Sequence, residues 1–371
     1  MIYLDHNATT PIDPRVLEAM LPYLQRFYGN PSGLYRLGRL SRSAVDTARN
    51  QVAELVGVSP NQVIFTSGGT EANNLALVSL EPMAGLAVSA IEHPSVIVPA
   101  ERLRQQGHPL TILGVDQDGL ILKDALDEII QTDITALVSI MLANNETGVI
   151  QDIEIHAEQL RGRNILLHTD AVQAAGKIPV DFNRLGVQLM SLSSHKIYGP
   201  KGAGALVFEK GTRLSPLLLG GGQEQDYRAG TENVAAIVGF GKAAELAKSE
   251  LAQRSEFLLG LKTQLEDGLR SIPGLCIFSE DAPRLPNTVQ FGLPNIDGEM
   301  RLMKLDQHGV AVSSGSACAS GGKEPSYVLT AMGVDPVLAR SALRISLGTS
   351  NTPDQISQII KILKNLVCQE G

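Results

Sequence analysis

Two residues that follow or end apolar segments, Lys196 and Asp170, suggest cofactor chemistry. Lys196 ends the polar run 193–196 directly after the apolar stretch 187–192, and Asp170 ends the segment 165–170. Either residue alone is most often a surface charge. Together they offer a Schiff-base amine and an acid for a pyridinium nitrogen, the usual protein contributions to pyridoxal phosphate (PLP). The pair therefore predicts a PLP site at the edge of a sheet.

The segment 67–70, Ser-Gly-Gly-Thr, predicts a phosphate-binding turn between a short apolar strand, 63–66, and a helix. Gly69 lets the backbone approach an oxyanion, the helix N-terminus favours negative charge, and Thr70 adds a hydroxyl. For this segment alone, a plain strand-to-helix turn with convenient glycines is an equally good interpretation.

Further polar residues stand at predicted strand ends, where open α/β sheets bind ligands. We expect Ser193 and His195, beside the lysine, to donate to the phosphate, and Gln173 to contact the ring hydroxyl. His93 is expected to stack on the ring, and Asn145 is expected to contact the cofactor or the substrate. A lone histidine is more often structural or solvated, so the role of His93 depends on the rest of the site.

Arg344 lies inside an apolar, strand-like run, 342–346. A charge in such a run is costly unless it is paired. The planar guanidinium matches a carboxylate in two parallel hydrogen bonds, and the carboxylate of an amino-acid substrate would satisfy it. A structural Asp or Glu would do so equally well, and the sequence leaves both partners open.

Cys318 lies in a run of small residues, 313–322, that we expect to form an exposed and mobile loop. A thiol on such a loop can enter a site, collect a group and deliver it elsewhere. An unreactive loop thiol is the alternative interpretation. Cys276 stands among apolar residues and is expected to be buried, while Cys368 carries no functional signal.

Composition narrows the class of protein. The chain has 371 residues, a hydrophobic content of 43%, a net charge of −8 and three cysteines. The acidic balance argues against nucleic acid or acidic membranes as partners. No stretch approaches the ~20 apolar residues of a membrane span, and the N-terminus lacks the features of a signal peptide. Sparse cysteines without paired spacing favour neither a disulfide framework nor a zinc site and fit a reducing cytoplasm.

The elements that must position these residues alternate between helix and strand. Most expected strands are continuous apolar runs, as in a parallel sheet covered on both faces; they span 63–66, 86–90, 110–113, 136–142, 165–169, 189–192 and 203–208. Expected helices span 14–25, capped by Asp13, and 40–56, 95–106, 122–131 and 153–161. A long charged helix, 232–270, leads to strands 287–292 and 343–347 and helices 298–308 and 352–366.

This order of elements predicts an α/β protein of two domains. The large domain, residues 14–250, would hold a mainly parallel seven-stranded sheet between helices. The smaller C-terminal α/β domain would combine residues 251–371, including the Cys318 loop, with residues 1–13, because chain ends often meet.

Ordered motifs along nearly the whole chain make it resemble the cysteine desulfurases of the NifS/IscS type, in the class V aminotransferase family with the fold-type I PLP architecture. The motifs include Tyr3-Leu-Asp-His-Asn-Ala-Thr-Thr-Pro11, Thr66-Ser-Gly-Gly-Thr-Glu71, Asn144-Asn-Glu-Thr-Gly148, Ser194-His-Lys-Ile-Tyr-Gly-Pro-Lys-Gly202, Arg228-Ala-Gly-Thr231 and Ser313-Ser-Gly-Ser-Ala-Cys318. The resemblance implies a homodimer that takes sulfur from L-cysteine, gives L-alanine, and passes the sulfur to an acceptor such as an iron–sulfur scaffold protein.

The resemblance also implies a role for each matching residue. Lys196 would bind PLP as an imine, Asp170 would keep the ring nitrogen protonated, and His93 would stack on the ring and shuttle protons. Cys318 would become a persulfide, and it is a possible transient iron–sulfur ligand although no resident metal is implied. The phosphate would be bound by Thr70, Ser193 and His195, together with Thr231 of a neighbouring subunit. Gln173 and Asn145 would contact the ring, and Arg344 would bind the substrate carboxylate.

Three features depart from the family pattern. Tyr35 stands where a histidine is frequent, Ser194 stands where glycine is common, and the sequence ends soon after the helix 352–366, where some relatives have a tail that helps to dock a scaffold. Four other functions stay open at this point: a selenocysteine lyase, a cysteine or cystine β-lyase, an aminotransferase in which Cys318 would be idle, and a non-catalytic sulfur-relay module.

Overall fold

A computed structural model describes residues 1–79, 83–131, 134–293, 298–314 and 325–370 of the chain. Its larger sheet has seven strands in the order β2-β8-β7-β6-β5-β3-β4, and all neighbours are parallel except for β8, which runs antiparallel to β2 and β7. The expected mainly parallel, seven-stranded α/β sheet is therefore confirmed. The strands are β2 (Val63–Thr66), β3 (Gly85–Ser89), β4 (Leu110–Leu113), β5 (Thr135–Ser139), β6 (Leu166–Asp170), β7 (Leu189–Ser193) and β8 (Gly204–Phe208).

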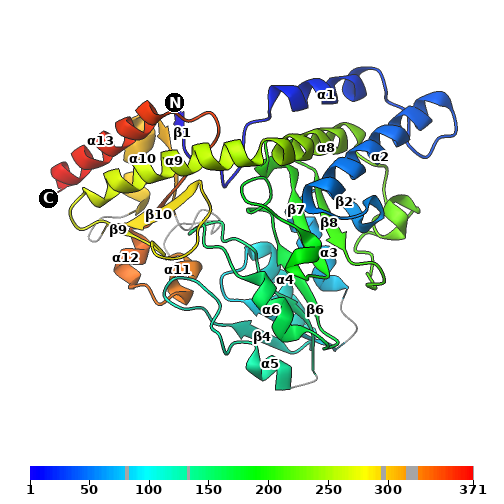
Figure 1. The fold of residues 1–371 in the computed structure, drawn as a ribbon, viewed down its shortest axis with the longest axis horizontal. Coiled ribbons are helices and arrows are strands. Elements are labelled where there is room, and N and C mark those ends of the chain that lie inside the picture. The colour runs from blue at the N-terminus through cyan, green and yellow to red at the C-terminus, as the bar shows by residue number, and fades with distance from the viewer. Residues whose placement is uncertain (80–82, 132–133, 294–297, 315–324, 371) are drawn as a thin grey trace.

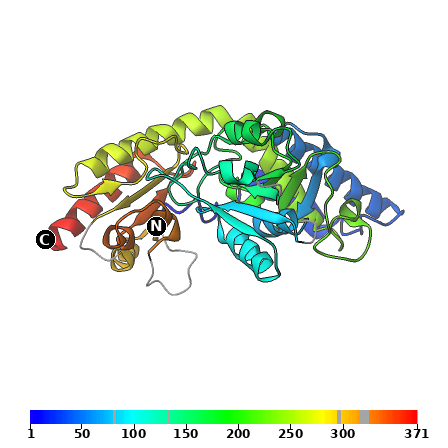
Figure 2. The same cartoon turned by 90° about the horizontal axis from the view of Figure 1, so that it is seen from below.

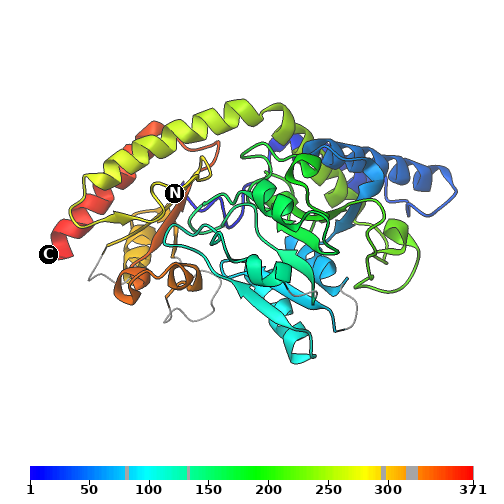
Figure 3. The ribbon, with the colours of Figure 1, turned by 60° about the horizontal axis from the view of Figure 1, so that its bottom comes forward.

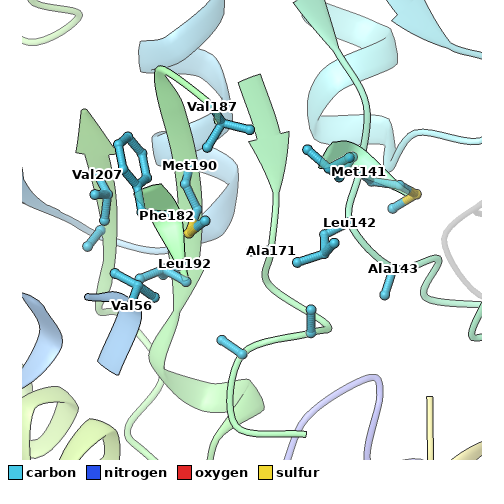
Figure 4. Close-up of a cluster of buried hydrophobic side chains, with 14 of the residues drawn as sticks. Val56, Met141, Leu142, Ala143, Ala171, Phe182, Val187, Met190, Leu192 and Val207 are labelled. Atoms are coloured by element: carbon cyan, nitrogen blue, oxygen red, sulfur yellow. The ribbon is translucent and has the colours of Figure 1, made fainter. Parts of the chain in front are cut away.

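Helices cover both faces of this sheet (Figure 1). Successive strand residues point to opposite faces, so Ile64 joins one hydrophobic cluster, while Val63 and Phe65 join the other. Figure 4 shows part of the second cluster, where Met190 and Leu192 lie with side chains from neighbouring elements. The first face packs against α3 (Gly69–Val78) and α4 (Pro94–Gln105), and the second against α1 (Pro14–Gln25), α2 (Arg36–Val56), α6 (Ile153–Leu160), α7 (Phe182–Leu185) and α8 (Val234–Ser249).

Local sequence signals explain several helix ends. Asp13 caps α1 by accepting a hydrogen bond from the backbone N–H of Arg15. The helix α2 ends at Gly57, whose φ of 74° is the left-handed conformation that glycine adopts at little cost. The helix α3 begins directly after β2, so the glycine-rich turn 67–70 lies at the edge of the sheet.

The C-terminal region forms a second, four-stranded sheet. Its antiparallel strands follow the order β12-β13-β10-β9, and the N-terminal strand β1 pairs with β11 beside them, so the chain start packs here as expected. Two long helices, α9 and α13, cover this sheet (Figures 2 and 3). Their apolar side chains pack with those of the sheet in a separate hydrophobic cluster. The elements are β1 (Ile2–Tyr3), β9 (Cys276–Ile277), β10 (Thr288–Gly292), β11 (Val310–Ala311), β12 (Ser313–Ser314), β13 (Leu343–Ser346), α9 (Leu251–Arg270), α10 (Gly298–Gln307), α11 (Tyr327–Ala331), α12 (Pro336–Arg340) and α13 (Pro353–Glu370).

Two helix predictions were wrong in extent. The single helix expected over 232–270 is two helices, α8 and α9, which meet at Glu250. The backbone of Glu250 leaves the helical region (φ −104°, ψ 6°), and its carboxylate binds Arg15 and Arg254. The helix expected over 122–131 is shortened to α5 (Asp127–Gln131).

The predicted burial of Cys276 was also wrong, because its side chain is exposed. It lies on β9, a two-residue strand at the edge of the small sheet, where alternate residues face opposite sides. The next residue, Ile277, takes the buried side. The division of the chain at residues 13/14 and 250/251 stays a prediction. None of the described helices combines the length and the apolar character that a bilayer-spanning segment needs.

Candidate active site

A cavity of about 300 Å³ opens at the carboxyl ends of β6 and β7. Most of the residues predicted from the sequence line it together, although they come from six separate parts of the chain. The lining residues are Asn7, Ala8, Gly69, Thr70, Asn73, His93, Ser95, Met141, Asn145, Asp170, Val172, Gln173, Ser193, His195, Lys196 and Arg344.

Lys196 enters this cavity from a short 3₁₀ turn, Ser194–Lys196, that follows β7. Its Nζ donates hydrogen bonds to the backbone oxygens of Asn7 and Ala8, the latter at 2.8 Å. The amine is thus held at the cavity wall by the N-terminal segment.

Asp170 ends β6 and is fixed by two donors. Its Oδ2 accepts from Asn73 Nδ2 at 2.7 Å, and its Oδ1 accepts from the backbone N–H of Val172 at 2.9 Å. The second proton of the Asn73 amide goes to Ser95 Oγ at 2.8 Å. One asparagine on α3 therefore links the acid to the residues at the start of α4.

His93 is the N-cap residue of α4. Its Nδ1 accepts from the backbone N–H of Ser95 at 3.1 Å and lies 2.7 Å from Ser95 Oγ. Burial lowers the pKa of His93 below its usual value, the nearby Asp170 raises it, and the cation at Lys196 lowers it further. With Nδ1 occupied as an acceptor, the neutral ring carries its proton on Nε2.

The glycine-rich turn forms a tight concave wall. A Cβ placed on Gly69 would lie 2.9 Å from Val172 Cγ2 and 3.5 Å from Ser193 Cβ, so a larger residue would fill this space. The hydroxyl of Ser193 is buried and has no hydrogen-bond partner among the described residues. Burial lowers the pKa of His195 to about 4, with further lowering by Lys196 and Lys201, and its ring is therefore neutral.

Arg344 reaches the cavity from β13 in the smaller sheet. Its Nη2 pairs with Asp5 Oδ1 at 2.7 Å, and its Nη1 donates to the backbone oxygen of Asn145 at 2.9 Å. Its Nε and the amide oxygen of Asn145 are buried without a hydrogen-bond partner in the described part of the chain. A structural acid thus occupies one side of the guanidinium, and one donor still faces no acceptor.

Two predicted residues are not placed in this cavity. Thr231 is exposed and lines a different hollow, with Arg228 and Gly230. Cys318 lies outside the described residues.

Sequence reasoning missed three residues that hold the site together: Asn7, Asn73 and Lys177. Asn7 is buried, and its side chain bonds to Lys177 Nζ (3.2 Å) and to Asn145, Asn287 and Thr288. Asn7 and Asn73 each stand inside a motif already noted, 3–11 and the helix after the glycine-rich turn, which was the available signal.

The structure accounts for one of the departures from the family pattern, Ser194. Ser194 is fully buried, and a Cβ on Gly199 would lie 2.0 Å from its hydroxyl, so a glycine at 199 makes room for the serine. Tyr35 precedes α2 with its side chain exposed, and nothing in the structure explains this substitution. Among the described residues, no group of His, Cys, Asp and Glu could hold a metal ion.

Comparisons with known proteins agree on one family. The family profile for aminotransferase class-V matches residues 2–359. The cysteine desulfurase IscS of Methanosarcina thermophila is 42% identical over 99% of this chain and 92% of its own length. A solved NifS-like protein superposes with a TM-score of 0.92 at 36% identity, covering 99% of both chains. The structure of SspA in complex with cysteine gives a TM-score of 0.83 at 32% identity, covering 95% of this chain and 100% of that one.

The chain belongs to the aminotransferase class-V family. Within that family it groups with the cysteine desulfurases, as the sequence motifs predicted.

Proposed function

We propose that this protein is a PLP-dependent cysteine desulfurase that converts L-cysteine to L-alanine and collects the sulfur as a persulfide on Cys318. The observation that carries the proposal is the meeting of Lys196, Asp170 and His93 in one cavity with the unpartnered side of Arg344. The full-length relatives named cysteine desulfurase support the same reaction.

The residues present fit PLP. The glycine wall, the orphaned Ser193 hydroxyl and the N-terminus of the ten-residue helix α3 offer space and donors for a phosphate. Asp170, fixed by Asn73, suits a protonated ring nitrogen, and Lys196 supplies the amine that would hold the group covalently. Thr70, Gln173, Asn145 and His195 line the same cavity, where we assign them to the phosphate and the ring.

When bound, PLP withdraws electrons from the bonds at the α-carbon of a joined amino acid. The Nζ of Lys196 then serves as the base for the α-proton. The negative charge of Asp170 would favour a proton on the ring nitrogen. His93 would lie against the ring, and the proton on its Nε2 would be available for delivery to substrate atoms.

Arg344 is our candidate for the substrate carboxylate. Asp5 occupies Nη2, so the guanidinium is held in place while the unpartnered Nε remains a donor. Asn145, whose backbone oxygen binds the same guanidinium, offers its side-chain amide to the same substrate.

Sulfur transfer requires a nucleophile. The thiolate of Cys318 attacks the substrate sulfur, and a sulfur–sulfur bond forms as the carbon–sulfur bond breaks. The electron pair of the broken bond remains with carbon, which takes a proton, and L-alanine leaves. Covalent capture divides the reaction into two easier steps.

We also propose a homodimer in which Thr231 of one subunit completes the phosphate site of the other. Thr231 is exposed and faces a separate hollow within its own chain, which supports a role across an interface. We place the reaction in the cytoplasm, with delivery of the persulfide sulfur to an acceptor protein such as an iron–sulfur scaffold.

The test is product analysis of the purified protein loaded with PLP. L-Cysteine should yield L-alanine, and a thiol reductant should release an equal amount of sulfide. A β-lyase would instead give pyruvate and ammonia. Cys318→Ala should keep the absorption of bound PLP and lose alanine formation.

The matched control is Cys276→Ala, because that thiol is exposed on an edge strand of the smaller sheet. It should turn over cysteine at the wild-type rate. Full alanine production by C318A would overturn the assignment of the nucleophile, and absence of alanine from the wild-type protein would overturn the proposed reaction.

A further inference from the structure

Lys177 is a buried lysine that the reaction described above does not use. It is 6% exposed and lies four residues after Gln173, which lines the cavity. Burial holds the pKa of Lys177 well below its usual value, and the neighbouring cations Lys196 and Arg344 lower it further. A buried lysine is costly to keep, so its contacts indicate what it does.

The contacts of Lys177 fix the orientation of one amide. Its Nζ donates to Gln173 Oε1 at 2.7 Å and to Asn7 Oδ1 at 3.2 Å. On the other side of the Gln173 amide, Nε2 donates to the backbone oxygen of Asn7 at 3.0 Å. An ammonium or amine donates here, and a carbonyl only accepts. In a flipped amide, the NH₂ group would face the Lys177 donor and the amide oxygen would face the Asn7 backbone oxygen. Only the observed orientation therefore satisfies both partners.

This orientation decides what Gln173 offers to a ligand. Gln173 lines the cavity, and its Nε2 carries two hydrogens, of which the Asn7 oxygen needs one. We propose that Lys177 is a positioning residue: it engages the Gln173 oxygen so that the NH₂ group donates to the ring-hydroxyl oxygen of bound PLP. This inference rests on the proposed cofactor and adds a residue that acts on it through another.

A donor at that oxygen stabilises its deprotonated form. Without Lys177, only the contact with the Asn7 backbone oxygen still holds the Gln173 amide, so the flipped orientation becomes more populated. The flipped amide presents an acceptor, which favours the protonated hydroxyl. Bound PLP with a deprotonated ring oxygen absorbs in the visible region, and the protonated form absorbs in the near ultraviolet. The ratio of the two bands therefore reports the orientation of Gln173.

The experiment compares the absorption spectra of PLP-loaded wild type, Lys177→Met and Lys177→Gln. Methionine keeps the length and removes the donor, whereas glutamine keeps a donor and removes the charge. We expect at least a twofold rise in the ultraviolet-to-visible band ratio in K177M and a near-wild-type ratio in K177Q. Thermal melts of the PLP-free proteins check that each variant is folded.

A second pair of variants separates positioning from general packing. Gln173→Ala should raise the band ratio by itself, and adding K177M to it should change nothing further, because Lys177 acts through Gln173. An unchanged ratio in K177M, or equal shifts from K177M with and without Q173A, would overturn the inference.

Should K177M fail to fold, Gln173→Glu carries the test, since a glutamate pairs with Lys177 but has no NH₂ group. An unchanged visible band in Q173E would overturn the inference. Failure of the wild-type protein to acquire PLP absorbance would instead contradict the proposed cofactor, and the inference with it.

Discussion

At the residue scale, Glu146 is, like Lys177, a buried group whose pKa is far from its usual value. It follows Asn145 and accepts hydrogen bonds from Ser326 Oγ at 2.5 Å and Gln290 Nε2 at 3.2 Å. Burial raises the pKa of Glu146 to about 7, against the lowering effects of Ser326, Arg344 and Gln290. The carboxyl thus joins the segment before α11 to the loop that carries a predicted substrate contact.

This raised pKa predicts a pH-dependent contribution to stability. Because the folded-state pKa lies above the unfolded value of 4.5, the contribution is fully present below pH 4.5 and is lost as the pH rises through about 7. Glu146→Gln removes the titration while keeping the shape. The free energy of unfolding of the wild type minus that of E146Q should fall by up to ~3 kcal/mol between acid and pH 8.

Denaturant titrations of both proteins across this pH range make the measurement. Subtraction of the variant removes the effects of groups that titrate alike in both. A difference that stays flat with pH would show that Glu146 titrates near its usual value.

At the element scale, the close approach of α2 and α8 depends on Gly241. A Cβ at this position would lie 2.5 Å from Ala48 Cα and 2.7 Å from Ala48 Cβ, so the two helices would have to separate. Gly241→Ala should lower the free energy of unfolding by ~1–3 kcal/mol, as overpacking does elsewhere. Gly260, on the exposed side of α9 with no atom within 4 Å of its Cβ position, is the matched control.

Gly260→Ala should raise stability by up to ~1 kcal/mol, because alanine is the better helix former. Chemical denaturation of the two variants gives opposite signs under this reasoning. Equal effects would mean that helix propensity, rather than the contact with α2, governs position 241.

The same scale shows what the sequence could predict. The strands β3 and β7 were recognised because predominantly apolar runs mark a buried parallel sheet, and Lys196 and Asp170 were recognised because they follow or end such runs. Asn73 and Lys177 were missed because their partners are set by packing between distant segments, which spacing along the chain does not encode. The break at Glu250 was missed for the same reason, since its partner Arg15 lies on α1.

At the scale of the whole molecule, the N-terminal segment joins the two sheets. The strand β1 pairs with β11, Asp5 pairs with Arg344 on β13, and the backbone oxygen of Asn7 accepts from Lys196 and Gln173 at the large sheet. The two sheets are therefore linked by a buried polar network, beside apolar contacts that Phe278, Val328 and Leu329 of the C-terminal region make with the core of the large sheet.

The side chain of Asn7 is the centre of that network. Its amide donates to the Asn145 backbone oxygen (3.1 Å) and Thr288 Oγ1 (2.9 Å), and its oxygen accepts from Lys177 Nζ (3.2 Å) and Asn287 Nδ2 (3.1 Å). Two of these partners belong to the large sheet region and two to the start of β10. Removing the Asn7 side chain takes one hydrogen bond from each of these four buried partners, although each keeps another.

Asn7→Ala should therefore lower the free energy of unfolding by ~2–4 kcal/mol and, in calorimetry, split or broaden a single transition into two as the regions lose their coupling. The variant keeps the backbone oxygen that Lys196 and Gln173 use, so uptake of PLP should survive. Asn164→Ala, an exposed change before β6 in the large sheet region, should shift stability by less than ~0.5 kcal/mol. If N7A melts in one transition at the wild-type temperature, apolar contacts couple the two regions and the polar network does not contribute to the coupling.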